Sequence, residues 1–358
     1  MIFFCLNANA QQPGFLDTSF ADKGILISEN FSGICTNLAL QKSGKVIGAW
    51  ATSDPGNIVI ARYNDDGSLD KSFNDSGFIY TVLEGFALIN SITILADDKI
   101  LVAGIYSQPP QNINVLLARY LPDGKPDSSF GENGIVTTDW GADAYYARMA
   151  VQSDGKIIVT GNYSKNENDI DRTFLVRYLP NGNVDESFGD KGLLITEYPS
   201  ILKVSCIAVQ PDDKILVGST GDYVTGSAYF QVARYLPDGV LDKNFGNNGI
   251  TQSPYSGYPN ILYTMALQDD GKIMTGGVGS SSKASGFGLI RFETNGNIDE
   301  AFGDKGLVIT PFDTSGSFIR ALAIQKDGKI IAAGQRFRVV PSYYNFALAR
   351  YKADGLLD

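Results

Sequence analysis

The sequence is built from a motif that recurs with unchanged internal spacing, and this repetition limits the possible folds more than any other feature of the chain. An arginine and, eight residues later, an aspartate recur at Arg62/Asp70, Arg119/Asp127, Arg177/Asp185, Arg234/Asp242, Arg291/Asp299 and Arg350/Asp358. Asp17 opens the series without an arginine. In every copy up to Gly306 a phenylalanine follows the aspartate by three residues and a glycine follows it by seven. A repeat of 53 to 59 residues predicts one repeat architecture rather than several unrelated domains.

The repeats account for residues 11–358, which we expect to form a single domain of six repeats. Residues 1–10 resemble the end of a secretory signal peptide, with an apolar segment Met1–Leu6 and an Ala8-Asn9-Ala10 cleavage site before Gln11. Six apolar residues are too few to cross a bilayer, which requires roughly 20. We therefore expect a protein that is secreted or held at the cell surface, without membrane insertion.

The composition excludes several classes of function. A net charge of −10 disfavours nucleic acids and anionic membranes as partners, because binding to them requires clustered Lys and Arg. The chain has no histidine, which removes every catalytic relay and every metal site that depends on one. The acidic segments 65–70 and 166–171 lack the ligand order of a known calcium loop. We predict no cofactor, and metal binding remains only a minor alternative.

The third repeat shows the strand pattern. Short β-rich segments occur at Ile135–Thr138, Tyr145–Gln152, Lys156–Gly161 and Phe174–Leu179. Asp154-Gly155 separates the second from the third and suggests a type I′ hairpin turn. Read in this order, the segment after the closing glycine is the innermost strand and the arginine lies on the outermost one. Six such units with no helical period predict an all-β, six-bladed β-propeller with four antiparallel strands per blade.

The segments Arg119–Gly134 and Arg234–Gly249 both read Arg-Tyr-Leu-Pro-Asp-Gly-x-x-Asp-x-x-Phe-Gly-x-x-Gly. This pattern resembles the delta-60 repeat family of secreted bacterial proteins, and the resemblance extends over Phe15–Asp358. It implies a β-propeller and an extracytoplasmic location. It implies no established activity.

The repeated residues have a structural explanation. We expect each arginine to pair with its aspartate across the intervening turn, each phenylalanine to fill the space between blades, and each closing glycine to adopt a positive φ. The predicted innermost strands are aliphatic and threonine-rich, as in Ile135–Thr138 and Leu193–Thr196. Such a lining does not provide the paired carboxylates that glycoside hydrolysis requires.

Recognition is expected where the repeat varies in length. A lysine follows the hairpin turn in each repeat. It comes 21 to 23 residues after the closing glycine, and the next arginine comes 17 to 21 residues after the lysine. Both segments are rich in aromatic residues, as interfaces are. The strongest candidate ligand-binding residues are Trp140, Tyr145, Tyr146, Tyr198, Tyr255 and Tyr258. The alternative is that many of these side chains, Trp140 included, are buried strand ends that contribute only to stability.

The sequence thus favours a secreted, monomeric, non-enzymatic β-propeller that acts as a binding or adhesion module for a glycan or protein ligand. One alternative is an exported glycan-active or lyase-type propeller enzyme that uses only Asp, Glu, Tyr and Arg. A second alternative is a structural spacer in a longer surface protein.

Overall fold

The computed structural model describes residues 17–27, 37–52, 57–108, 112–164, 172–196, 203–221, 228–253, 260–281, 284–312, 316–338 and 343–358. Contacts divide the chain into two compact units. The first unit comprises residues 1–149 with 180–183, and the second comprises residues 150–179 with 184–358.

The described residues form six antiparallel sheets, so the chain has the all-β fold class of a six-bladed β-propeller. The first two sheets contain β1 (Asn37–Leu40), β2 (Val46–Ala51), β3 (Ile58–Tyr63) and β4 (Phe78–Thr81), then β5 (Phe86–Ile94), β6 (Ile100–Ser107), β7 (Asn114–Tyr120) and β8 (Ile135–Thr138). The next two contain β9 (Asp143–Val151), β10 (Ile157–Ser164), β11 (Arg172–Tyr178) and β12 (Leu193–Thr196), then β13 (Lys203–Val209), β14 (Ile215–Gly221), β15 (Tyr229–Tyr235) and β16 (Ile250–Gln252). The last two contain β17 (Ile261–Leu267), β18 (Ile273–Ser280), β19 (Ser285–Phe292) and β20 (Leu307–Thr310), then β21 (Ser317–Ile324), β22 (Ile330–Arg338) and β23 (Tyr343–Tyr351). A single 3-10 turn, η1 (Phe73–Asp75), is the only helical element among the described residues.

Strand order within each sheet follows the chain, but each sheet begins one strand later than the sequence analysis predicted. The strand after the closing glycine pairs with the preceding arginine strand, so that Ile79 lies opposite Ile60 and Val136 lies opposite Leu117. The strands that begin at Phe78, Ile135, Leu193, Ile250 and Leu307 are therefore the outermost strands of their sheets. The prediction that they are innermost, and that the arginine strand is outermost, is wrong. The reason is that the pattern of four strands recurs along the chain, so that any of the four could be the first strand of a sheet. The strand pattern alone does not show where a sheet starts.

The hairpin turn between the first and second strands also differs from the prediction. In the third repeat Gly155 donates its N–H to the Gln152 carbonyl oxygen and has a φ of 81°, while Asp154 is not among the residues with positive φ. A type I′ turn needs positive φ at both central residues. The turn therefore uses a single left-handed residue, and Asp98 fills this position in the second repeat with a φ of 64°.

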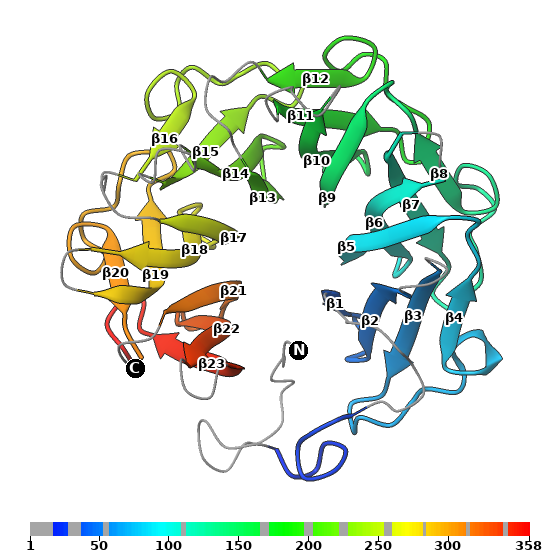
Figure 1. Cartoon of the computed structure of the whole chain (residues 1–358), viewed down its shortest axis with the longest axis horizontal. Helices are drawn as coiled ribbons and strands as arrows, with labels where there is room; N and C mark the ends of the chain where they lie inside the picture. Colours follow the sequence, from blue (N-terminus) through cyan, green and yellow to red (C-terminus); the bar gives the residue numbers. More distant parts are fainter. Residues whose placement is uncertain are drawn as a thin grey trace. The chain divides into compact units, whose positions relative to one another are not determined.

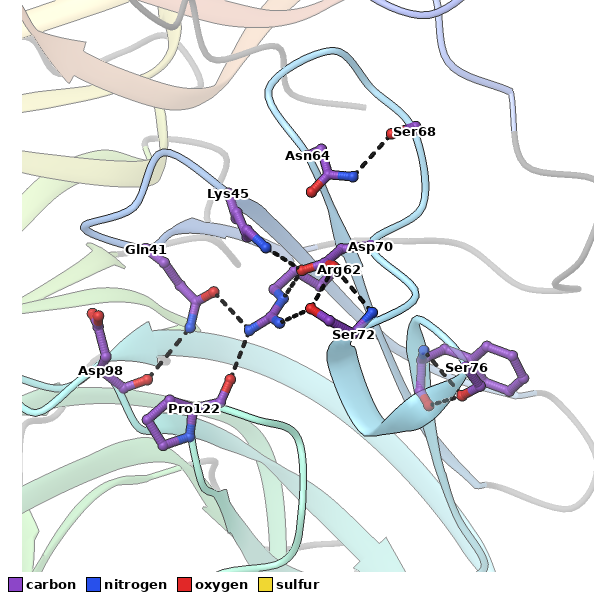
Figure 2. A network of polar contacts seen from close by, with 11 residues as sticks. Gln41, Lys45, Arg62, Asn64, Ser68, Asp70, Ser72, Ser76, Asp98 and Pro122 are labelled. Carbon is purple, nitrogen blue, oxygen red and sulfur yellow. Dashed lines mark hydrogen bonds and ion pairs between the residues drawn. The ribbon is translucent and has the colours of Figure 1, made fainter.

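The repeated arginine anchors the joint that follows its strand, as the sequence predicted. Figure 2 shows Arg62, whose Nε lies 2.7 Å from Asp70 Oδ2 and whose Nη1 donates to the Pro122 carbonyl oxygen of the next sheet at 2.7 Å. Lys45 Nζ lies 2.5 Å from the same carboxylate, and the guanidinium carbon lies 4.5 Å from the centre of the Phe73 ring. The equivalent arginine–aspartate distances are 2.8, 2.8, 2.9, 2.6 and 2.6 Å for the pairs that begin at Arg119, Arg177, Arg234, Arg291 and Arg350.

Burial of apolar faces between neighbouring sheets of one unit forms the core. In the second unit Phe287 and Leu289 of β19 pack with Ile319 of β21 and Ala349 of β23. The motif phenylalanines from Phe73 to Phe302 are completely buried in such layers, whereas Phe20 is partly exposed, and each buried ring contributes about 2–3 kcal/mol by removal from water. Figure 1 shows the consequence for the second unit, in which the first strands β13, β17 and β21 lie side by side.

Candidate functional site

The residues predicted from sequence as ligand-binding are described only in part. Tyr198, Tyr255 and Tyr258 lie outside the described residues. Trp140, just before β9, is half-buried, and its indole Nε1 is buried without a hydrogen-bond partner in the described part of the chain. Tyr146 on β9 is 54% exposed. The six residues therefore remain a prediction.

The two carboxylates beside Trp140 hold the local backbone. Asp139 Oδ1 accepts hydrogen bonds from Gly141 N at 2.7 Å and Asn112 Nδ2 at 3.1 Å. Asp143 Oδ1 accepts a hydrogen bond from Ile113 N at 2.8 Å. These contacts give both carboxylates a structural role that the sequence analysis did not anticipate.

A second group of residues stands out because the first strands of four sheets are bulged. The register shifts between Ile89 and Ser91 in β5, Val204 and Cys206 in β13, Leu262 and Thr264 in β17, and Ile319 and Ala321 in β21. The extra residues are Asn90, Ser205, Tyr263 and Arg320. A bulge bends its strand and changes the direction of a side chain, and bulges are common beside active sites.

Two of these bulge residues meet in the second unit. The guanidinium carbon of Arg320 lies 4.4 Å from the centre of the Tyr263 ring and 4.6 Å from the centre of the Phe318 ring. The two rings are 5.6 Å apart at an interplanar angle of 45°. We call Tyr263, Phe318 and Arg320 the Tyr–Arg cluster. Arg320 is exposed, and the two rings are half-buried, so the cluster is open to a ligand.

Further aromatic rings extend the cluster over the last sheet. Tyr344 lies 6.0 Å from Phe318 and 5.2 Å from Phe337, measured between ring centres. Tyr344 is 59% exposed. Phe337 and Tyr344 belong to a length-variable segment in which the sequence analysis expected recognition, whereas the Tyr–Arg cluster itself was missed.

A signal for the bulges is present in the sequence. A regular strand alternates, so apolar residues that face one side are separated by one residue. In Leu262-Tyr-Thr-Met265 and Ile319-Arg-Ala-Leu322 two residues separate them, and alternation resumes afterwards. This break in period marks a bulge at Tyr263-Thr264 and at Arg320-Ala321.

Two cavities of the second unit are weaker candidates. Volumes of 480 and 380 Å³ lie beside Arg291 and Arg234, respectively, with Gln268 and Gln210 in their linings. Both guanidinium groups are already occupied, since Arg291 contacts Asp299 at 2.6 Å and Arg234 contacts Asp242 at 2.9 Å. These cavities therefore belong to the repeated joint. Within the described ranges, no group of three or more acidic, Cys or His residues is placed to hold a metal ion.

None of the helices in the described residues is long and apolar enough to cross a membrane. No curated protein matches the sequence. Among solved structures, a polysaccharide lyase of family PL25, an ulvan lyase bound to -[GlcA(1-4)Rha3S]-, has a TM-score of 0.56 at 11% identity, covering 89% of this chain and 78% of the other. The GH93 α-L-arabinofuranosidase of Fusarium graminearum, in complex with arabinobiose, has a TM-score of 0.51 at 10% identity, covering 88% and 93%. A protein from Lactobacillus plantarum has a TM-score of 0.51 at 13% identity, covering 90% and 85%.

These neighbours correct one prediction. The sequence analysis concluded that the protein is not an enzyme, chiefly because it lacks histidine. Two structures with the same fold are glycan-active enzymes, so it was wrong to exclude an enzyme on that ground. At 10 to 11% identity the likeness establishes the fold and does not transfer an activity.

A family model matches all six repeats, at residues 41–73, 95–130, 152–188, 210–245, 268–302 and 325–358, which is more than half of the chain. Its description is a domain of unknown function (DUF5122) beta-propeller, and the delta-60 name is not the one that matches. The chain therefore belongs to the DUF5122 beta-propeller family.

Proposed function

We propose that this protein is a glycan-active enzyme that binds a polysaccharide at the Tyr–Arg cluster and cleaves it there. The observation that carries the proposal is the position of Arg320, exposed on one bulge and held against the rings of Tyr263 and Phe318. The fold supports the proposal because a polysaccharide lyase and an arabinofuranosidase share it.

The chemistry of the cluster suits a sugar chain. Aromatic rings offer flat apolar faces for sugar rings, and the exposed ring of Tyr344 continues the surface from Phe318. Arg320 supplies hydrogen-bond donors in a fixed plane. The Tyr263 hydroxyl is a group that can transfer a proton during bond cleavage.

Location is a second part of the proposal. Polysaccharides are encountered mainly outside the cytoplasm, and the resemblance of residues 1–10 to the end of a signal peptide supports export. The amino-terminal sequence of protein recovered from the culture medium tests this point. A chain that stays in the cytoplasm with residues 1–10 intact would contradict export.

The activity is tested by incubating the purified protein with neutral polysaccharides (arabinan, xylan), uronate polysaccharides (polygalacturonate, alginate, hyaluronan) and a sulfated one (carrageenan). New reducing ends are measured. We expect cleavage of at least one polymer. The variant Tyr263→Phe keeps the ring but loses the hydroxyl, and we expect its turnover to fall about 100-fold or more with an unchanged melting temperature.

The matched control is Tyr229→Phe, which removes the hydroxyl of another half-buried strand tyrosine. We expect this variant to cleave at the rate of the unmodified protein. Failure to cleave any of the polymers, or full activity in Tyr263→Phe, would contradict the proposal.

A further inference from the structure

We infer that the polysaccharide is acidic, that Arg320 binds the carboxylate of a uronate unit, and that the chain is cut by elimination with Tyr263 as the base. This inference rests on the proposed function and names its substrate class and reaction.

The charge of Arg320 is available to a ligand. Its contacts with described residues are the two ring contacts, and no described carboxylate lies within ion-pair distance. Other cations of the repeats are used internally, as Lys272 is by Asp299 at 2.8 Å and Lys99 is by Asp127 at 3.3 Å. In a chain of net charge −10, an exposed and unneutralised guanidinium can attract an anion, and its ring contacts distinguish Arg320 from other exposed arginines.

The geometry of Arg320 suits a carboxylate. A guanidinium that lies over aromatic rings is held in one orientation by the ring electrons and by packing. The N–H groups at its edge remain free to bind both oxygens of a carboxylate, which is the strongest hydrogen-bonding arrangement that arginine makes. Because Tyr263 and Phe318 both contact Arg320, the anion and the sugar ring that bears it are recognised at one place.

The groups around Arg320 favour elimination over hydrolysis. The neighbouring first strands β13, β17 and β21 carry no Asp or Glu. These strands therefore do not supply the two facing carboxylates that hydrolysis requires. Elimination needs instead a cation on the uronate carboxylate and a base at the adjacent carbon. Arg320 is such a cation, and the hydroxyl of Tyr263, whose ring contacts Arg320, can serve as the base.

The step balances without any co-reactant. The ionised Tyr263 oxygen removes the proton from C5 of the uronate. This C5 proton becomes more acidic when Arg320 neutralises the carboxylate. The electron pair of the C5–H bond forms the C4–C5 double bond, and the C4–O glycosidic bond breaks. The leaving oxygen takes a proton from Tyr263 or from solvent, which yields an unsaturated sugar and a new chain end without consumption of water.

The experiment compares polygalacturonate with its carboxyl-reduced form, and dextran sulfate with dextran. Cleavage is followed by ultraviolet absorbance of the C4–C5 double bond, and binding is measured by calorimetry with Tyr263→Phe. We expect polygalacturonate or another uronate polymer of the panel to bind and give the absorbance, and its carboxyl-reduced form to do neither. Because a sulfate ester cannot activate the C5 proton, dextran sulfate is expected to bind at most and not to be cut.

Variants identify the residue. Arg320→Met is expected to bind the uronate polymer about 10- to 100-fold more weakly, since a charged hydrogen-bond pair is lost, and Arg320→Lys is expected to lie between. Arg172→Met removes an exposed arginine from β11 and leaves the same net charge, and we expect it to behave as the unmodified protein.

The possible outcomes separate the two proposals. Cleavage of arabinan or xylan but of no uronate polymer would overturn the inference and leave the proposed function in place. New reducing ends from a uronate polymer without the absorbance would overturn elimination, because they indicate hydrolysis. Unchanged binding in Arg320→Met would overturn the role of that residue. Absence of cleavage of every polymer would contradict the proposed function itself.

Discussion

At the scale of single residues, the repeated aspartate is an anion kept almost out of water by partners from three parts of its repeat. Asp127 is buried and contacts Arg119 at 2.8 Å, Lys99 at 3.3 Å and the Ser129 hydroxyl at 2.6 Å. Burial alone raises the pKa of Asp127, but the hydrogen bonds from Ser129 and the charges of Arg119 and Lys99 outweigh it and lower the pKa to about 2. Such a carboxylate stabilises the fold only while it is ionised.

This shift predicts how stability depends on pH. The ordinary pKa of the group is 3.8, and a lowered folded value means that the stabilisation is complete above pH 4 and is lost as the pH falls toward 2. We expect Asp127→Asn to lose about 2 kcal/mol at pH 7 and to reduce the loss of stability between pH 4 and pH 2. Denaturant unfolding at a series of pH values measures this. Asp123→Asn, on an exposed turn of the same repeat, is the control, and an equal effect in both variants would contradict the assignment.

The arginine–aspartate pairs were predictable from sequence because their spacing never changes and only a turn separates them. The lysine was not predicted as the second cation. Lys45 and Lys272 follow the hairpin turn that joins the first strand to the second. Only the register of the sheet brings them to Asp70 and Asp299. A contact between strands depends on their register, and the spacing of residues within one motif does not specify that register.

At the scale of structural elements, the bulges of β5, β17 and β21 are each accommodated by a glycine on the neighbouring strand, whereas Ser219 lies opposite Val204 at the bulge of β13. Gly334 of β22 lies opposite Ile319, and a Cβ at Gly334 would collide with the Phe318 carbonyl oxygen. Gly104 of β6 lies opposite Ile89, and a Cβ there would collide with the Leu88 carbonyl oxygen in the same way. At the bulges of β5, β17 and β21 the backbone approaches the second strand closely, so a side chain would collide there.

The glycines offer a matched pair of variants. Gly334→Ala forces the bulge that carries Arg320 to move, whereas Gly104→Ala moves the bulge that carries Asn90. We expect both to lose about 1–3 kcal/mol of stability, as overpacking does. Only Gly334→Ala should also weaken polygalacturonate binding, measured by calorimetry on folded protein. If both variants bound equally well, the position of the β21 bulge would not matter for the ligand.

The strands themselves were predictable from alternation, but their grouping into sheets was not. A signal for the grouping exists in the lengths. The segment from Arg119 to Gly134 keeps the same length in every complete repeat because it is a joint within one sheet, whereas the connection from β8 to β9 leads to the next sheet and varies between repeats. The shift by one strand leaves the candidate loops unaffected, since the two variable connections still leave the same end of each sheet.

At the scale of the whole molecule, charge acts in two opposite ways on an acidic ligand. The net charge of −10 repels a polyanion at long range, while Arg320 attracts one carboxylate at contact. Long-range forces govern the rate of association, and contacts that exclude water govern the rate of dissociation. The two contributions can therefore be separated by ionic strength.

Salt should accelerate the binding of an acidic polysaccharide to this protein. The screening length falls from about 30 Å at 0.01 M to about 8 Å at 0.15 M, which removes most of the long-range repulsion and leaves a contact pair much less affected. We expect the association rate constant of Tyr263→Phe on immobilised polygalacturonate to rise over this range, and the dissociation rate to change less. Arg320→Met should show the same rise in association but faster dissociation at every salt concentration. Association that slows as salt is added would mean that a local positive field, and not the net charge, guides the ligand to the cluster.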